Sequence, residues 1–296
     1  MYAITGATGN TGSKIAEHLL AEGKKIRVIG RNAEKLQPLV DKGAEALTGS
    51  LEDQEFVNSA FRGAFAVYAM IPSHLTAENF RAYQNRVGEV LANALKASGI
   101  EYVVNLSSLG AHLSEGTGPI LGLYDQEQRL NQLKGLNVVH LRPTYFMENL
   151  FANIPLIKSQ GFNGGPLKAD VSFPMIATKD IVKVAVEYLM KLDFKETSIR
   201  ELLGQRDLSM NEITQIIGKA IEKPDLSYVQ VPYDAVEQYL VQAGLSPDMA
   251  RLLIELNRSI NEGSAITGTP RTEENTTETS FEEFAETTFA PIYKSS

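Results

Sequence analysis

The sequence predicts an α/β fold in which a doubly wound parallel sheet is followed by a smaller C-terminal α/β lobe. Three observations support this prediction. Short runs rich in β-branched and aromatic residues alternate with longer amphipathic runs through the first half of the chain. A glycine-rich turn directly follows the first short run, and after about Phe146 the alternation gives way to mostly helical patterns. Strand–helix alternation of this kind builds a parallel sheet with helices on both faces.

Each element of the first half is predicted from its own pattern. The predicted strands are residues 2–5, 26–30, 45–48, 66–71, 102–107 and 138–142. Helices between them are predicted from apolar faces that include Ile15 and Leu19, Phe56 and Ala60, and Val87 and Leu91. These elements form a first domain over residues 1–150.

Residues 151–296 are predicted to form the smaller lobe and to return one or two strands to the sheet. The turn-forming residues 161–166 predict a loop, and helices are predicted at 178–190, 211–220, 235–242 and 249–260. Ser280 and Glu283 have the spacing of a capping box for a last short helix. The stretch from Glu262 to Glu286 contains seven glutamates and one arginine; we interpret it as a solvated face, with a partner site as the alternative.

Composition excludes several classes of function. The chain has 296 residues, 43% hydrophobic, with 28 basic and 36 acidic residues, a balance that disfavours nucleic-acid binding. It contains no cysteine and four histidines, none paired at metal-ligand spacing, so we expect no metal site. No apolar stretch is long enough to span a bilayer and no leader is visible, which predicts a cytoplasmic protein without membrane contact.

The turn after the first strand has the pattern of a phosphate-binding loop. Its sequence, GATGNTG, places Gly6, Gly9 and Gly12 between a strand and an amphipathic helix. A dinucleotide pyrophosphate needs a tight turn, close backbone approach and amide donors at a helix N-terminus. We therefore expect Gly6 to make the turn, Gly9 to admit the pyrophosphate, and Gly12 to let the helix lie close to the strand. A tight turn without a ligand is the alternative.

The end of the second strand favours NADP(H) over NAD(H). An acidic residue at this position binds the ribose 2′-hydroxyl of NAD, whereas a basic residue suits the 2′-phosphate of NADP. Here the sequence is Gly30-Arg31-Asn32, and Lys35 follows one helical turn later. We expect Arg31 to bind the phosphate with Lys35 as a second charge, the alternative being that Arg31 is a solvated loop residue.

Three blocks together resemble the NmrA-like family of atypical short-chain dehydrogenase/reductases. They are ITGATGNTG from Ile4, LRPTYFMENL from Leu141, and ATKDI from Ala177. The resemblance covers nearly the whole chain and implies a Rossmann domain, a small substrate lobe, and a nicotinamide nucleotide between them. Some family members are quinone or isoflavone-type reductases, and others are redox sensors that bind the nucleotide without turnover.

The resemblance also implies positions for the cofactor contacts. The pyrophosphate would be bound by Thr8, Gly9, Asn10 and Thr11, the adenosine end by Arg31, Ser50, Leu51 and Glu52, and the nicotinamide end by Ile71, Pro72, Ser107, Ser108 and the turn containing Pro143, Tyr145 and Phe146. The family commonly has an aspartate where Ser50 stands. The acceptor would be bound by Tyr145 and Asn149, although Asn149 could instead be a buried structural amide.

The catalytic residues are the least determined part of the site. Typical short-chain dehydrogenases pair a tyrosine with a lysine four residues later, whereas Tyr124 is followed at that distance by Gln128. A phenol near pKa 10 needs such a cation to act at neutral pH. We name Tyr124 and Ser107 as catalytic candidates, and His74 and His112 as alternative proton donors or bystanders.

Two functions remain open, with a third behind them. The first is an NADPH-dependent oxidoreductase acting on a quinone-like or small carbonyl acceptor, for which hydride positioning can supply much of the rate. The second is a nucleotide-binding redox sensor that acts through a protein partner. A sugar-nucleotide epimerase would need the missing tyrosine–lysine pair.

Overall fold

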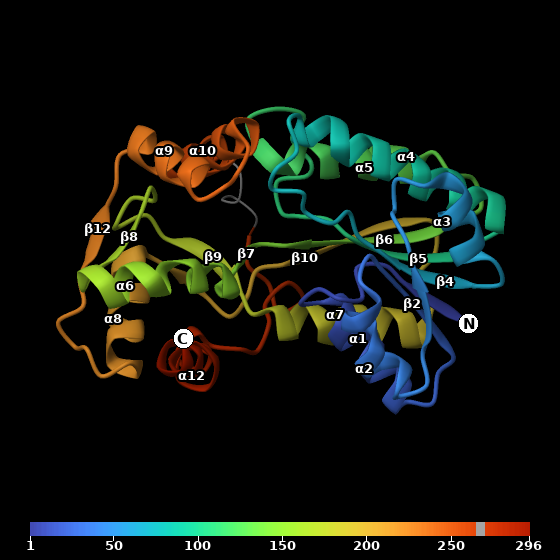
Figure 1. Cartoon of the computed structure of the whole chain (residues 1–296), viewed down its shortest axis with the longest axis horizontal. Helices are drawn as coiled ribbons and strands as arrows, with labels where there is room; N and C mark the ends of the chain where they lie inside the picture. The colour runs from blue at the N-terminus through green and yellow to red at the C-terminus, as the bar shows by residue number, and fades with distance from the viewer. Residues whose placement is uncertain (265–269) are drawn as a thin grey trace.

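The computed structural model describes residues 1–264 and 270–296, and its main feature is a seven-stranded sheet (Figure 1). Every neighbouring pair in this sheet is parallel, which confirms the predicted fold class. The strand order is β10-β6-β5-β4-β1-β2-β3. Their bounds are β1 Tyr2–Ile4, β2 Ile26–Gly30, β3 Glu45–Thr48, β4 Ala66–Ala69, β5 Tyr102–Leu106, β6 Asn137–Pro143 and β10 Thr197–Leu202.

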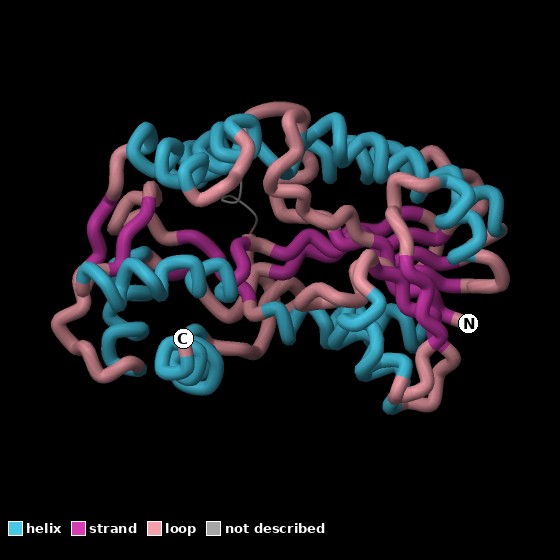
Figure 2. Tube along the Cα trace, viewed as in Figure 1, coloured by secondary structure: helices cyan, strands magenta, loops and turns pink. Residues whose placement is uncertain are grey.

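Helices cover both faces of this sheet, as Figure 2 shows. One face carries α1 (Gly12–Ala21), α2 (Ala33–Val40) and α7 (Thr178–Lys191), and the other carries α3 (Gln54–Phe61), α4 (Phe80–Ser98) and α5 (Leu121–Asn131). Each face has its own apolar core, the first containing Ile15, Leu19 and Ile181, the second Val57, Val87 and Leu91. The helical periodicity predicted these buried stripes because only one side of each helix can face the sheet.

A second lobe with a separate apolar core is built from two small sheets and several helices. The sheets are β11–β9–β7 and β12–β8, with bounds β7 Tyr145–Phe146, β8 Asn163–Gly165, β9 Phe173–Ile176, β11 Asp207–Leu208 and β12 Tyr228–Gln230. The helices are α6 Ile154–Gln160, α8 Met210–Ala220, α9 Tyr233–Gln242, α10 Pro247–Glu262, α11 Phe281–Phe284 and α12 Ala290–Ser295, with short helical turns η2 Met147–Asn153 and η3 Ala285–Phe289. A further short turn, η1 Gly118–Ile120, directly precedes α5 and contacts both α5 and α10.

The predicted loop at 161–166 is wrong, because its central residues form β8. Parallel pairing with β12 satisfies the backbone of this glycine-rich stretch, a long-range contact that local turn propensity cannot indicate. The buried Asn163 is also bonded at both ends of its amide, accepting from Asn153 at 2.7 Å and donating to Thr214 at 2.8 Å.

After the first excursion into the second lobe, the chain returns to the main sheet as α7 and β10. Strand β10 pairs with β6 along its whole length, from Thr197 opposite Val138 to Leu202 opposite Pro143. Helix α7 packs beside α1 on the sheet. The division of the chain at residue 150 stays a prediction.

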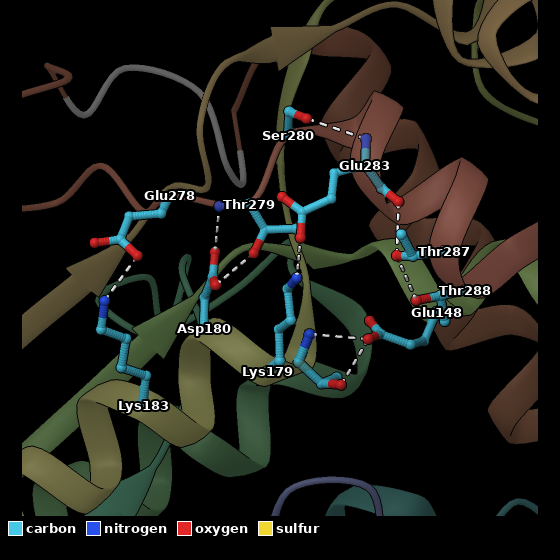
Figure 3. A network of polar contacts seen from close by, with 11 residues as sticks. Glu148, Lys179, Asp180, Lys183, Glu278, Thr279, Ser280, Glu283, Thr287 and Thr288 are labelled. Carbon is cyan, nitrogen blue, oxygen red and sulfur yellow. Dashed lines mark hydrogen bonds and ion pairs between the residues drawn. The ribbon is translucent and has the colours of Figure 1, made fainter.

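The acidic run near the C-terminus is largely paired within the chain. Glu278 and Glu283 contact Lys183 and Lys179 of α7 (Figure 3), and Glu274 and Glu282 contact Arg200 and Arg206. Asp180, buried in the first turn of α7, accepts hydrogen bonds from the backbone and hydroxyl of Thr279 at 3.1 and 2.6 Å. The run therefore attaches the C-terminal segment to the sheet domain, and it offers less free charge to a partner than its composition suggests.

The last short helix has only half of the predicted capping box. The hydroxyl of Ser280 accepts from the backbone N–H of Glu283 at 3.1 Å. The carboxylate of Glu283 instead contacts Lys179, so the return hydrogen bond of a capping box is replaced by an ion pair with α7.

A buried histidine beneath the sheet edge makes stability depend on pH. His140 of β6 is fully buried, with Nε2 bonded to Asn131 Oδ1 at 2.8 Å and Nδ1 to the Asn105 amide at 3.0 Å. Burial lowers the pKa of His140 to about 4, so the folded protein holds the neutral ring. The stabilisation is complete above the unfolded-state pKa near 6.5 and is lost as the pH falls toward 4.

We therefore expect the free energy of unfolding to fall by about 2 kcal/mol between pH 7 and pH 5 through this one group. Chemical denaturation of the wild type and His140→Gln over this range measures the effect, since glutamine keeps a hydrogen-bonding amide but does not titrate. Equal pH slopes in the two proteins would contradict the prediction.

Candidate functional site

The three glycines of the first loop differ in what surrounds them. Gly6 has a φ of +62°, and a Cβ added to it would lie 2.5 Å from Met70 Sδ. A Cβ on Gly12 would lie 2.4 Å from the Gly6 carbonyl oxygen, deep in the backbone of the turn. Gly9 is exposed, and its Cβ would approach only the Gly6 oxygen, at 3.3 Å. Gly6 and Gly12 are thus required by the turn itself, whereas the space above Gly9 is open to a ligand.

Other loop residues divide between the surface and the core. Thr8 and Asn10 are exposed on the loop. Thr11 is buried, and its hydroxyl accepts a hydrogen bond from the buried Tyr68 of β4 at 2.9 Å. The side chain of Thr11 therefore fastens the start of α1 to the sheet, and a ligand on the loop would meet its backbone.

A solvent-open cavity lies beside this loop at the carboxyl ends of β1, β2 and β3. It brings together residues that the sequence places far apart. Its lining includes the predicted cofactor residues Gly6, Thr8, Arg31, Ser50, Leu51, Glu52 and Pro72. Ile29, Gly30, Gly49, Tyr83 and Val87 complete the wall. Ligands of open α/β sheets bind at this edge.

The sequence did not indicate Tyr83 and Val87 as site residues. Both project from α4, which was predicted as a core helix from the same apolar periodicity. Lys35 was predicted in the site but does not line the cavity: it lies exposed on α2, where its backbone N–H is capped by Asn32 at 3.0 Å. Within the described ranges, the guanidinium of Arg31 has no ion-pair or hydrogen-bond partner.

At the predicted nicotinamide end, Ser107 belongs to a buried charged network. Its hydroxyl donates to Glu127 Oε1 of α5, and Glu127 accepts two more hydrogen bonds from Arg142 of β6, at 3.0 Å from Nε and 2.6 Å from Nη2. All three residues are buried. Because the single proton of Ser107 is donated to Glu127, this hydroxyl can accept a hydrogen bond from a ligand but has no proton left to give.

The remaining predicted nicotinamide residues are buried or pack against the apolar cores. Pro143 ends β6 and is buried, Phe146 packs on the core shared with α1 and α7, and Ile71 packs on the core beneath α4. None of these lines the cavity described above. Ile71 is followed by Pro72, which does line it.

The substrate candidates Tyr145 and Asn149 have different environments. Tyr145 packs edge-on against Phe173, 5.5 Å between ring centroids, and burial raises the pKa of its phenol to about 12. Asn149 is exposed in η2, which excludes the alternative of a buried structural amide. Its neighbour Glu148 (labelled in Figure 3) has the structural role: its carboxylate accepts from the backbone N–H and hydroxyl of Thr178 at the start of α7, at 2.9 and 2.6 Å.

Tyr124 lies outside the cavity. It lines an open groove between α4 and α5 together with Arg81, Asn85 and Asp125. Arg81 donates to both Asp125 oxygens, at 2.8 and 2.9 Å, and this contact lowers the pKa of Asp125. The structure thus places Ser107 and Tyr124 in separate surroundings, and a joint catalytic role for them stays a prediction without geometric support.

The histidine candidates also differ in position. His112 is exposed in the loop after β5. His74 lies against Tyr83, 5.0 Å between ring centroids, beside the cavity wall. Among residues 1–264 and 270–296, no group of three His, Cys, Asp or Glu side chains could hold a metal ion. No helix in the same ranges is long and apolar enough to cross a membrane.

The parallel sheet, the glycine turn after β1 and the cavity at the carboxyl edge define a Rossmann-type α/β protein. The chain matches the model of the NmrA-like family over residues 2–285 and belongs to this family. The resemblance found in its sequence motifs is therefore confirmed.

Among curated proteins, the chain is similar to quinone oxidoreductase 2 of Escherichia coli, with 26% identity over 272 residues covering 89% of each chain. Among solved structures, it resembles the NADPH complex of an NADPH-dependent quinone oxidoreductase from E. coli, with a TM-score of 0.78, 20% identity, and coverage of 100% and 99%. It also resembles a Citrobacter triphenylmethane reductase complexed with NADP(H), with a TM-score of 0.77, 18% identity, and the same coverage. At these identities the structural likeness is one of fold.

Proposed function

We propose that this protein is an NADPH-dependent oxidoreductase that reduces a quinone-like or other small conjugated carbonyl acceptor. The observation that carries the proposal is the cavity beside the open face of Gly9, with the unpaired Arg31 on its wall. Its lining contains the residues expected to contact the adenosine half of a dinucleotide, and a helix N-terminus lies next to it. Family membership and the similarity to quinone oxidoreductase 2 support the reaction class.

When bound, the nicotinamide would supply a hydride to the conjugated acceptor, and water would supply the proton that neutralises the reduced acceptor. Reduction of a quinone leaves a stabilised hydroquinone anion, so the reaction does not require a strong acid from the protein. The residues of this chain would bind and orient the cofactor. The loop at Gly9 would bind the pyrophosphate, and Arg31 would bind the adenosine end. The free lone pair of the Ser107 hydroxyl would accept a hydrogen bond from a donor group of the ligand. Such positioning can account for much of the rate.

Calorimetric titration with NADPH and NADH, followed by NADPH oxidation with benzoquinones and naphthoquinones, tests this proposal. We expect tighter binding of NADPH and turnover with at least one quinone. Absence of nucleotide binding would reject the function altogether.

A nucleotide sensor without turnover is the second candidate, and one observation favours it. Neither predicted catalytic residue can donate a proton at the cavity, because Ser107 donates to Glu127 and Tyr124 lies in another groove. Tight NADPH binding with no oxidation by any acceptor would support the sensor. The C-terminal glutamates pair with lysines and arginines of the same chain, and this pairing makes the acidic surface less suited to a protein partner.

Arg31→Ala should weaken NADPH binding about tenfold, the size of one lost charge-assisted contact at an exposed site, and change NADH binding less than twofold. Only NADPH carries the additional phosphate. The two dissociation constants are compared by the same calorimetry. Equal losses for both nucleotides would show that Arg31 does not select the cofactor.

A further inference from the structure

Helix α4 brings a second cation close to the cavity beside the glycine turn, which we name the adenosine cavity from its proposed ligand. Tyr83 lines the cavity, and Arg86 lies one turn further along the same helix. Glu52, which follows β3 and also lines the cavity, accepts a hydrogen bond from Arg86 Nε at 3.2 Å. Arg86 is therefore held beside the cavity by a residue of the cavity wall, although two elements, α3 and β4, separate the two in sequence.

Two guanidinium groups lie near the Tyr83 phenol. Arg31 and Tyr83 line the same cavity, and Arg86 is bonded to Glu52 of its wall. In agreement, burial raises the pKa of the Tyr83 phenol, Arg31 and Arg86 each lower it through their charge, and Glu52 raises it. Two such cations around one hydroxyl form a centre suited to a doubly charged anion.

Among the described residues, most of the donors at this point have no partner within the protein. Nε of Arg86 is bonded to Glu52, while its two terminal nitrogens have no hydrogen-bond partner in the part of the chain that is described. The Tyr83 hydroxyl and the Arg31 guanidinium are equally without partners in those ranges. Glu52 thus orients Arg86 through Nε and leaves its two terminal nitrogens available. A pair of guanidinium nitrogens is the arrangement that binds two phosphate oxygens.

We propose that Arg86 and Tyr83, together with Arg31, form the site for the phosphate monoester on the adenosine ribose, with Glu52 as the residue that positions Arg86. This deepens the proposed function, on which it rests, by assigning cofactor selectivity to α4 as well as to the loop after β2. The ligand class is an adenosine carrying a 2′-phosphate. The Glu52 charge, already paired, would repel this phosphate less than a free carboxylate would.

The test uses fragments of the cofactor that cannot react. Adenosine 2′,5′-bisphosphate and 5′-AMP differ by the phosphate in question, and both lack the nicotinamide. For Arg86→Gln we expect about fivefold to tenfold weaker binding of the bisphosphate, the range for a charged contact at an exposed site, with 5′-AMP changed less than twofold. For Tyr83→Phe we expect about a threefold loss confined to the bisphosphate.

Lys96→Gln is the matched control, because it removes one positive charge from the exposed face of the same helix away from the cavity lining. It should leave both affinities unchanged. Equal losses for the two fragments in Arg86→Gln, or no loss, would overturn the proposal. If the wild type bound neither NADPH nor the fragments, the proposed function itself would fail. If Arg86→Gln still bound NADPH and still preferred the bisphosphate to 5′-AMP as strongly as the wild type, only this inference would be rejected.

Discussion

Replacing Gly9 by valine should weaken binding of NADPH at least about 100-fold, equivalent to about 2.7 kcal/mol, while leaving the protein folded. The backbone of Gly9 does not have a positive φ, and an added Cβ meets only one protein atom, at 3.3 Å. The rest of the new side chain would fill the space in which a pyrophosphate would contact the loop. Calorimetric titration with NADPH and a thermal melt of the same sample measure both effects.

Gly12→Ala is the matched comparison, and we expect the opposite pattern. Its Cβ would lie 2.4 Å from the Gly6 oxygen and 2.8 Å from the Gly6 carbonyl carbon, so the turn must move. Such overpacking costs about 1–3 kcal/mol of stability. Wild-type affinity in Gly9→Val would remove the pyrophosphate assignment, and a stable Gly12→Ala would remove the packing role of that glycine.

Arg142→Met should lower the free energy of unfolding by about 3–5 kcal/mol, since it leaves the carboxylate of Glu127 buried without its cation. Glu127 is 1% exposed and Arg142 7%, and two hydrogen bonds join them. These contacts connect α5 to β6 and hold the hydroxyl of Ser107. Urea denaturation at neutral pH gives the loss directly.

The double variant Glu127→Leu/Arg142→Met separates the ion pair from simple packing. With both charges removed, no unpaired charge stays buried, and we expect much of the lost stability to return. A single variant within about 1 kcal/mol of the wild type would contradict the buried-pair account. The account would also be contradicted if the double variant lost as much stability as the two single variants lose together.

The sequence predicted which residues meet at this edge of the sheet because the edge is built from local signals. A strand, three spaced glycines and an amphipathic helix are consecutive in the chain, and residues that end neighbouring parallel strands must meet at one edge of the sheet. Gly6, Arg31 and Ser50 therefore converge in the structure as expected. Tyr83 could not be foreseen, because helical periodicity predicts a buried residue without saying whether it faces the core or a cavity.

Charged partners were beyond prediction for a related reason. Glu127 lies three residues from Tyr124 on α5, and nothing in their spacing indicates that the first pairs with Arg142 beneath the helix and the second faces an open groove. Likewise, Glu148 and Asn149 are adjacent, yet one caps α7 and the other is exposed. Which side of a helix or turn faces which neighbour depends on packing between segments distant in sequence.

The sequence by itself determined the family, the parallel sheet and the glycine-rich turn after the first strand, because each depends on periodicity and spacing within a few tens of residues. Only the tertiary structure decided how β8 pairs with β12, that β10 pairs with β6, and that α4 forms a wall of the cavity beside the glycine turn. It also decided that the hydroxyl of Ser107 is donated to Glu127. These features are contacts between segments far apart in the chain, whose free energy comes from burial and hydrogen bonding that exist only once the fold has formed.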